Sequence, residues 1–175
     1  MTYTKDQAIQ KIADKLSELT YEKTLLLLSG GSSAEVGVKA LLQAQPKYTT
    51  VAMVDERYVA YGSENSNATL LKEYGLQDFS EIIQKDSLDR HETARQYETT
   101  LSDLVQNSGK VIAVMGIGTD FHIAGILPNS EAAKTEHDGI IDYDTEQFER
   151  ITITPAFFNH IDCLYIYAEG EAKAE

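Results

Sequence analysis

Three short apolar runs, each followed by glycines or charged residues, constrain the fold of this chain more than any other feature. They are Thr24–Leu28 (TLLLL), Val51–Val54 (VAMV) and Val111–Met115 (VIAVM). A strand with one face in water alternates apolar and polar residues, whereas these runs are almost continuously apolar. Each run is therefore expected to form a strand buried on both faces, as in a parallel sheet covered by helices.

Amphipathic helical patterns separate the three runs. The first begins at Thr4, which has the spacing of a capping box with Gln7, and others cover residues 34–44, 66–75 and 89–107. Strands that alternate with helices are typical of βαβ units. We therefore expect one α/β domain over the whole chain: a doubly wound, mostly parallel sheet with helices on both faces, a Rossmann-like three-layer sandwich.

The remaining segments give weaker patterns. Residues 55–65 are polar and predict a loop, and residues 81–85 predict a marginal strand. Residues 151–154 and 164–167 predict two further strands, joined by a helical turn at 155–160. The length of 175 residues is that of a single domain.

The charge balance excludes several classes of partner. Fifteen Lys and Arg residues against 28 Asp and Glu residues give a net charge of -13, which argues against nucleic acid and anionic membranes. No apolar run approaches the roughly 20 residues that span a bilayer, and the N-terminal segment lacks a signal peptide's apolar core. Cys163 is the single cysteine, which fits a reducing cytoplasm. Any anionic ligand must therefore be held by a local site.

In doubly wound sheets ligands bind beyond the carboxyl ends of the strands, which directs attention to three loops. In the first, Gly30 and Gly31 let the backbone approach a ligand, and Ser32 adds a hydroxyl at a helix N-terminus. This loop is either a phosphate cradle or an ordinary strand-to-helix turn with a serine cap.

The second loop opens with Asp55, Glu56 and Arg57. Arg57 has the geometry to bind a phosphate with two parallel hydrogen bonds, and Asp55 can act as a base or orient one. The alternative is a surface ion pair of little energetic value.

The third loop contains Asp120 and His122, two residues apart after a buried strand. Histidine is the natural proton shuttle near neutral pH, and a carboxylate can orient it. The alternative is a solvated histidine on a loop. The other histidines and the cysteine do not follow a buried strand in this way and are expected to be structural or solvated. They are His91, His137, His160 and Cys163, and their spacing is not that of a zinc site.

These loops, in this order, resemble one family. The matching stretches are LLLLSGGSSAE, VAMVDERYV with SENSNATLL, VIAVMGIGTDFHIAGILP, and RITIT with GEAKA. They are similar to the 6-phosphogluconolactonases and their relatives, the glucosamine-6-phosphate deaminases. The resemblance implies a doubly wound α/β fold, in agreement with the pattern of strands and helices.

The resemblance favours the lactonase branch. Deaminases typically have Asp-Glu-Tyr where this chain has Asp-Glu-Arg, and a glutamate where it has Leu127, which cannot transfer protons. The implied activity is hydrolysis of 6-phospho-D-glucono-1,5-lactone to 6-phosphogluconate in the pentose phosphate pathway. The alternatives are a glucosamine-6-phosphate deaminase or isomerase-like enzyme, and a non-catalytic sugar-phosphate-binding module.

The resemblance also assigns roles. His122 is implied as the general base for water, with Asp120 orienting it. The residues implied to bind the phosphate are Gly30, Gly31, Ser32, Arg57 and Lys173, with Arg150 as a further candidate. No metal or organic cofactor is implied. The implied partner is a small-molecule sugar phosphate, and the expected state is a monomer or a homodimer.

Two departures from the family pattern carry expectations of their own. Phe121 stands where the family has a glycine, which predicts a shifted loop or a pocket of changed shape. Relatives continue past the motif at 170–174 with another helix and strand, which this sequence lacks, so Lys173 is expected to lie at a fraying end.

Overall fold

The computed structural model describes residues 3–19, 21–83 and 89–170. Helices and strands follow in the order α1 (Lys5–Glu18), β1 (Thr24–Leu28), α2 (Ser32–Ala44), β2 (Thr49–Met53), β3 (Asp55–Arg57), α3 (Asn67–Glu73), α4 (Arg90–Gln106), β4 (Lys110–Gly116), α5 (Glu131–Lys134), β5 (Ile140–Asp144), β6 (Glu149–Ile153), the 3-10 helix η1 (Ala156–His160) and β7 (Cys163–Tyr167).

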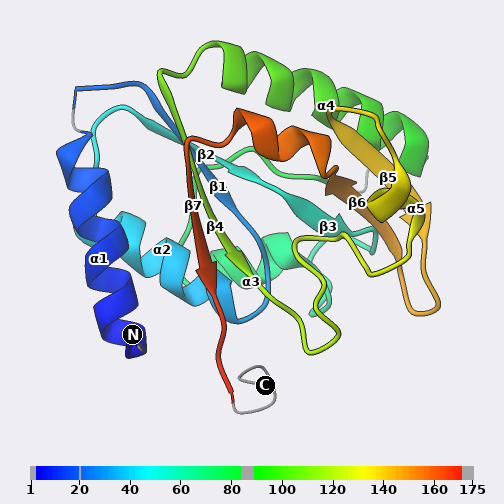
Figure 1. Ribbon diagram of the computed structural model, residues 1–175, viewed down its shortest axis with the longest axis horizontal. Coiled ribbons are helices and arrows are strands. Elements are labelled where there is room, and N and C mark those ends of the chain that lie inside the picture. The colour runs from blue at the N-terminus through cyan, green and yellow to red at the C-terminus, as the bar shows by residue number, and fades with distance from the viewer. Residues whose placement is uncertain (1–2, 20, 84–88, 171–175) are drawn as a thin grey trace.

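The three apolar runs form the centre of a four-stranded parallel sheet in the order β2-β1-β4-β7. Leu25, Leu26, Leu27 and Leu28 of β1 are fully buried, as expected for a strand covered on both faces. Figure 1 shows α1 and α2 on one side of this sheet and α4 on the other. The predicted α/β class with a mostly parallel sheet and helices on both faces is therefore confirmed.

Two helices show why this sequence forms these elements. The Thr4 side chain accepts from the backbone of Gln7, and the Gln7 side chain accepts from Thr4, so the predicted capping box is present. On α4, the buried Tyr97 hydroxyl donates to the Met53 carbonyl (2.6 Å) and accepts from the Met53 amide (2.8 Å). The two hydrogen bonds of Tyr97 fasten α4 to the outer edge of β2.

A second sheet, which the sequence did not predict, is antiparallel and has the order β3-β6-β5. The predicted loop at 55–65 is wrong at its start, because Asp55–Arg57 forms β3. The predicted strand at 151–154 exists as β6, but it belongs to this smaller sheet. Strand β5 and helix α5 were not anticipated.

Val54 joins the two sheets. Its amide donates to the Leu28 carbonyl (3.0 Å), and its own carbonyl accepts from the Ile153 amide (2.9 Å). The chain leaves β2 beside β1 and enters β3 beside β6 at this residue. The carboxyl ends of the parallel strands therefore open directly onto the antiparallel sheet.

The predicted strand at 81–85 is not formed in its described part. Glu81, Ile82 and Ile83 are outside any strand, and residues 84–85 lie outside the described residues. Within the described part of this segment, pairing is limited to Ser80, which bridges to Ala52 of β2. Among the described residues, no helix is long and apolar enough to cross a membrane.

Candidate active site

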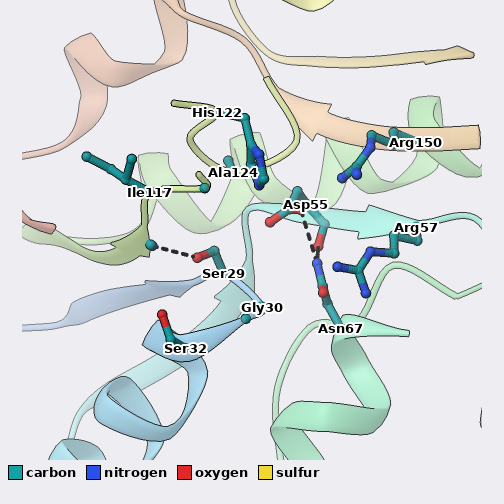
Figure 2. A pocket seen from close by; sticks show the side chains of 13 residues that line it. Ser29, Gly30, Ser32, Asp55, Arg57, Asn67, Ile117, His122, Ala124 and Arg150 are labelled. Carbon is teal, nitrogen blue, oxygen red and sulfur yellow. Dashed lines mark hydrogen bonds between the residues drawn. The ribbon is translucent and has the colours of Figure 1, made fainter. Parts of the chain in front are cut away.

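A cavity of about 190 Å³ lies where the carboxyl ends of β1 and β4 meet the antiparallel sheet. Figure 2 shows side chains from the β1–α2 loop, β3, α3, the loop after β4 and β6 converging on it. Its walls are formed by Ser29, Gly30, Gly31, Ser32, Asp55, Arg57, Asn67, Gly116, Ile117, Gly118, His122, Ala124 and Arg150. All three loops singled out in the sequence therefore contribute to one cavity.

The first wall is the loop that leads from β1 into α2. Gly31 has φ +65°, a left-handed conformation that glycine adopts without strain, and caps α2 without a side-chain hydrogen bond. A Cβ at Gly30 would lie 1.9 Å from Asn67 Oδ1, so only glycine fits there. The Ser29 hydroxyl accepts from the Gly116 amide (3.2 Å) and ties the first loop to the third.

Strand β3 supplies the second wall through its alternation. Asp55 and Arg57 point to the cavity, whereas Glu56 points away and accepts four hydrogen bonds, three of them from groups at the start of α3. Its carboxylate accepts from the Ser66 hydroxyl and from the amides of Arg57, Asn67 and Ala68. Burial raises the pKa of Glu56 to about 7 although these hydrogen bonds act in the opposite direction.

Asp55 lies at the centre of the cavity in Figure 2 and is 4% exposed. Its Oδ2 accepts from Asn67 Nδ2 (3.0 Å), while Oδ1 is buried with no hydrogen-bond partner among the described residues. Burial raises the pKa of Asp55, and the positive charges of Arg150 and Arg57 oppose that rise. A substrate hydroxyl could satisfy the free oxygen.

Arg57 and Arg150 face each other directly across the β3–β6 ladder. Like charges opposite one another destabilise a sheet unless an anion lies between or beside them. Arg57 donates to the Asn65 carbonyl (3.0 Å) and stacks over the Phe148 ring at 5.3 Å. The Nε atoms of both arginines are buried without a hydrogen-bond partner within the described part of the chain. This arrangement can bind an anion although the whole chain is acidic.

The third wall carries the groups that can move protons. His122 Nδ1 lies 2.5 Å from Asp120 Oδ1. Partial burial raises the pKa of Asp120, but the hydrogen bonds and charge of His122 outweigh it and lower the pKa overall. A Cβ at Gly118 would lie 2.2 Å from His122 Nδ1, so the pair requires a glycine there. The pairing leaves the other ring nitrogen free for a ligand.

Phe121 adopts a backbone conformation that is uncommon for a residue with a large side chain. Its φ is +66°, so the backbone keeps the left-handed conformation that glycine would favour. Its side chain is 69% exposed and is not part of the cavity wall. The phenylalanine ring therefore lies in solvent, outside the set of residues that line the cavity.

The far end of the loop that carries His122 is fastened to the antiparallel sheet. The Gly125 amide donates to the Thr152 hydroxyl (3.0 Å), and the Tyr143 hydroxyl donates to the Gly125 carbonyl (2.5 Å).

A second and wider cavity of about 700 Å³ lies next to the first and shares His122, Arg57 and Arg150 with it. These three residues thus form the passage between the inner cavity and the outer groove.

The structure brings together most of the residues singled out in the sequence. Eight of the nine lie in the cavity wall or, for Asp120, in contact with it: His122, Asp120, Asp55, Gly30, Gly31, Ser32, Arg57 and Arg150. Lys173 lies outside the described residues. Sequence reasoning gave no role to Asn67, although its stretch was part of the resemblance, and the Asn67–Asp55 bond spans two elements that the sequence does not pair.

The remaining histidines lie elsewhere, each beside a carboxylate. His91 contacts Asp142 (2.6 Å), and the other two pairs are His137 with Glu98 and His160 with Asp138. Within residues 3–19, 21–83 and 89–170, no group of three or more His, Cys, Asp or Glu side chains is arranged to hold a metal ion.

Comparison with known proteins assigns the chain to a family. The family model described as "Glucosamine-6-phosphate isomerases/6-phosphogluconolactonase" matches residues 3–175. The chain belongs to this family. The "Probable 6-phosphogluconolactonase 1" of Arabidopsis thaliana is 27% identical over 176 residues, covering 85% of this chain and 65% of the relative. The 6-phosphogluconolactonase of Rhizobium meliloti (strain 1021) is also 27% identical, over 86% of this chain and 70% of the relative. The chain therefore spans about two thirds of the length of these family members.

Solved structures agree on the fold. A 6-phosphogluconolactonase from Shewanella baltica OS155 superposes with a TM-score of 0.77 at 23% identity, covering 99% of this chain and 81% of the other. The enzyme from Trypanosoma brucei gives 0.75 at 22% identity, covering 99% and 82%. This family member thus shares their α/β architecture over nearly its whole length.

Proposed function

We propose that this chain hydrolyses 6-phospho-D-glucono-1,5-lactone to 6-phosphogluconate, a step of the pentose phosphate pathway. The observation that carries the proposal is the convergence of a His–Asp pair, an arginine pair and a glycine-rich helix start around one small cavity. Lactone hydrolysis needs a base for water, donors for the developing oxyanion and an anchor for the phosphate. The family and its curated relatives named as 6-phosphogluconolactonases support the same activity.

In this mechanism the phosphate binds to the backbone amides of Gly30 and Gly31, the Ser32 hydroxyl and Arg57, with Lys173 as a further predicted ligand. A helix N-terminus and a guanidinium both favour a dianion. Asp55 accepts a hydrogen bond from a sugar hydroxyl through its free Oδ1, which fixes the ring in the cavity. The phosphate and the ring together place the lactone carbonyl near His122.

His122 then removes a proton from water as the water oxygen attacks the lactone carbonyl carbon. The bond from that carbon to the ring oxygen breaks, and His122 returns the proton to the ring oxygen. Asp120 holds Nδ1 and stabilises the imidazolium between the two transfers, because the pair lies at 2.5 Å. The lactone and one water become the open-chain acid without a cofactor.

Freshly prepared lactone tests this proposal, with acid release followed at constant pH and corrected for spontaneous hydrolysis. We expect wild-type turnover, and a fall in kcat on the order of 10²-fold or more in His122→Asn. His91→Asn is the matched control, because that histidine also pairs with a carboxylate but is remote from the cavity. Turnover that survives His122→Asn would remove His122 as the base.

The same preparation separates the alternatives. Binding of 6-phosphogluconate without turnover would identify a non-catalytic sugar-phosphate-binding module. Release of ammonia from glucosamine 6-phosphate would identify a deaminase. Leu127 opposes the latter, because a leucine lining the groove beside the cavity cannot assist ring opening.

A further inference from the structure

The side-chain amide of Asn67 belongs to the cavity wall but has no part in the mechanism proposed above. Asn67 is the first residue of α3 and is 4% exposed. In Figure 2 its side chain lies beneath Asp55, with Gly30 on one side and Arg57 on the other. An amide has a donor end and an acceptor end, so its orientation decides which groups of a ligand it can bind.

Hydrogen bonds to Asp55 fix the orientation of this amide. Asn67 Nδ2 donates to the backbone carbonyl of Asp55 (3.2 Å) and to its carboxylate Oδ2 (3.0 Å). The backbone carbonyl can only accept, so the nitrogen end faces Asp55 whether or not that carboxyl group is protonated. An amide nitrogen has two hydrogens, and both are used here. Asn67 therefore has no donor left for a ligand.

The oxygen end of the amide lies on the other side, next to the loop that leads into α2. A Cβ at Gly30 would lie 1.9 Å from Asn67 Oδ1, so this glycine makes room for the oxygen. Among the described residues, none donates a hydrogen bond to Oδ1. A polar atom of a buried side chain is destabilising unless a donor reaches it. Asn67 thus offers a ligand one acceptor and no donor.

The two free acceptors of this wall lie on side chains that are bonded to each other. Asp55 Oδ1 also has no hydrogen-bond partner within the described part of the chain. Arg57 and Arg150, in contrast, can only donate. A phosphate or carboxylate group accepts hydrogen bonds and pairs with the arginines, whereas a hydroxyl group donates and pairs with the two oxygens. The hydroxyl-bearing carbon chain of a sugar phosphate therefore matches Asp55 and Asn67.

Resting on the function proposed above, we propose that Asn67 is a specificity-determining residue whose Oδ1 accepts a hydrogen bond from a hydroxyl group on the carbon chain of the sugar phosphate. Its Nδ2 at the same time holds Asp55, which accepts from a second hydroxyl. A ligand that lacks the first hydroxyl leaves Oδ1 without a donor in the occupied cavity. The site therefore selects fully hydroxylated sugar phosphates over deoxy analogues.

Four ligands test this assignment by direct calorimetric binding: 6-phosphogluconate and its 2-deoxy, 3-deoxy and 4-deoxy analogues. Wild type is expected to bind at least one deoxy analogue about tenfold more weakly than 6-phosphogluconate. In Asn67→Ala the preference for one of these hydroxyls should fall to within about twofold, which identifies the hydroxyl that Oδ1 accepts. An unchanged set of preferences in a folded Asn67→Ala variant, verified by circular dichroism, would overturn the assignment.

Asn67→Asp separates acceptance from the orientation of Asp55. Aspartate keeps an oxygen at this position but has no N–H group for Asp55. A carboxylate at the first position of α3 is also compatible with the helix. We expect Asn67→Asp to keep a preference of about fivefold or more for the hydroxyl identified with Asn67→Ala, although its added charge weakens all four anionic ligands. Equal loss of the preference in both variants would show that Asn67 only orients Asp55.

Ser66→Ala is the matched control at the start of α3. The Ser66 hydroxyl donates to Glu56 (2.8 Å) and caps the helix, but Ser66 lies outside the set of residues that line the cavity. This variant should unfold at a lower temperature than wild type and keep every ligand preference within about twofold. A preference lost in Ser66→Ala as well would mean that the position of α3, and not Asn67 Oδ1, selects the ligand.

Binding does not depend on turnover, so the two proposals fail separately. A preference that depends on Asn67, together with absent lactone hydrolysis, would refute the activity but keep the hydroxyl site. Lactone hydrolysis that depends on His122, with the preference intact in Asn67→Ala, would refute the specificity role alone. No binding of 6-phosphogluconate by wild type would overturn both.

Discussion

The two sides of the cavity are built in opposite ways. On the β3–α3 side, Asp55 and Asn67 are each 4% exposed and bonded to each other, and Glu56 gathers four hydrogen bonds behind them. On the 116–128 loop, the side chains of His122 and Asp120 are 32% and 53% exposed. The first side is fixed by burial, whereas the second side carries its two proton-transfer groups on a part-exposed loop.

This difference corresponds to different tasks. Groups that bind and orient a ligand work best when neighbouring side chains lock them in place. A histidine that activates water must be reached by that water, which requires a part-exposed position. If the comparison is correct, damage to the loop should reduce activity without loss of stability, whereas damage to the β3–α3 side should reduce both.

The largest expected effect is in the loop. In Gly118→Ala the new Cβ would lie 2.2 Å from His122 Nδ1 and 2.5 Å from Asp120 Oδ1, so the His–Asp pair must separate. Because His122 is part-exposed, its ring can turn outward at little cost to folding. We expect kcat for lactone hydrolysis to fall by about 10²- to 10³-fold, with the melting temperature changed by no more than about 2 °C.

The measurements are initial rates with fresh lactone and a thermal melt on the same preparation. Gly62→Ala is the control for handling of a loop glycine, because nothing lies within 4 Å of its missing Cβ; its φ of +79° predicts a small loss of stability only. Destabilisation of Gly118→Ala by several kcal/mol would show that the loop is as tightly fixed as the strand side, and the contrast between the two would be lost.

The next effect tests the buried side through pH. Burial raises the pKa of Glu56 to about 7 from an ordinary value near 4.5. Between these values the folded state holds a proton that the unfolded state has lost, so this group's contribution to stability declines as pH rises. Relative to Glu56→Gln, the wild-type unfolding free energy should fall by about 3 kcal/mol from pH 4.5 to pH 8.

Urea unfolding of both proteins across this pH range gives the difference directly, and the many other carboxylates cancel in it. Glu92→Gln is the matched control, since Glu92 is a surface residue whose pKa is lowered, first by its hydrogen bond with Gln96. The difference in unfolding free energy between wild type and Glu56→Gln could also prove independent of pH. That result would mean that the four hydrogen bonds keep Glu56 ionised throughout this range.

The third prediction makes the same kind of substitution as the first, glycine to alanine, on the buried side of the cavity. Gly30→Ala would place a Cβ 1.9 Å from Asn67 Oδ1, a similar collision on the opposite wall. Asn67 is buried and bonded to Asp55, so it has no free space to turn into. We expect a loss of about 2 kcal/mol in unfolding free energy together with a rise in KM, measured by urea titration and by substrate saturation.

Asn67→Gly combined with Gly30→Ala serves as the control for the collision, because it removes the side chain that is struck. Part of the loss caused by Gly30→Ala should disappear in that background. A Gly30→Ala variant as stable as wild type would show that Asn67 moves as freely as His122, and the two walls would then not differ.

The same contrast explains what the sequence could predict. A continuous apolar run indicates by itself that a strand is buried on both faces, so β1, β2 and β4 could be predicted. The carboxyl ends of these strands then indicated which three loops to consider. Strand β5 was missed because its polar residues are stabilised from a distance: Arg90 of α4 donates to Asp142 (2.7 Å) and also pairs with Asp144. No local pattern reveals such pairs.

The site residues also differ in how far a local sequence pattern could predict them. His122, Asp55 and Arg57 follow buried strands in the sequence and were recognisable as candidates. The position of Arg150 opposite Arg57 depends on the register of an antiparallel ladder, and the role of Asn67 depends on a contact across two elements. Register and long-range contacts are set by the folded whole, which is why Arg150 was a candidate only through the family resemblance and Asn67 was given no role.

The smallest expected effect returns to Phe121, where the loop carries backbone strain. A phenylalanine at φ +66° costs about 1 kcal/mol relative to glycine, and its exposed ring gains little from packing. Phe121→Gly also raises the conformational entropy of the unfolded chain, which offsets part of this gain. We therefore expect a net stabilisation of no more than about 0.5 kcal/mol, with kcat and KM within about twofold of wild type. Asn129→Gly, at φ +62° in the same loop, is the control and should gain less, because asparagine tolerates this conformation. A tenfold rise in kcat for Phe121→Gly would show instead that the ring obstructs the passage at His122, and that the exposed side of the site is constrained by its side chains as well as by its backbone.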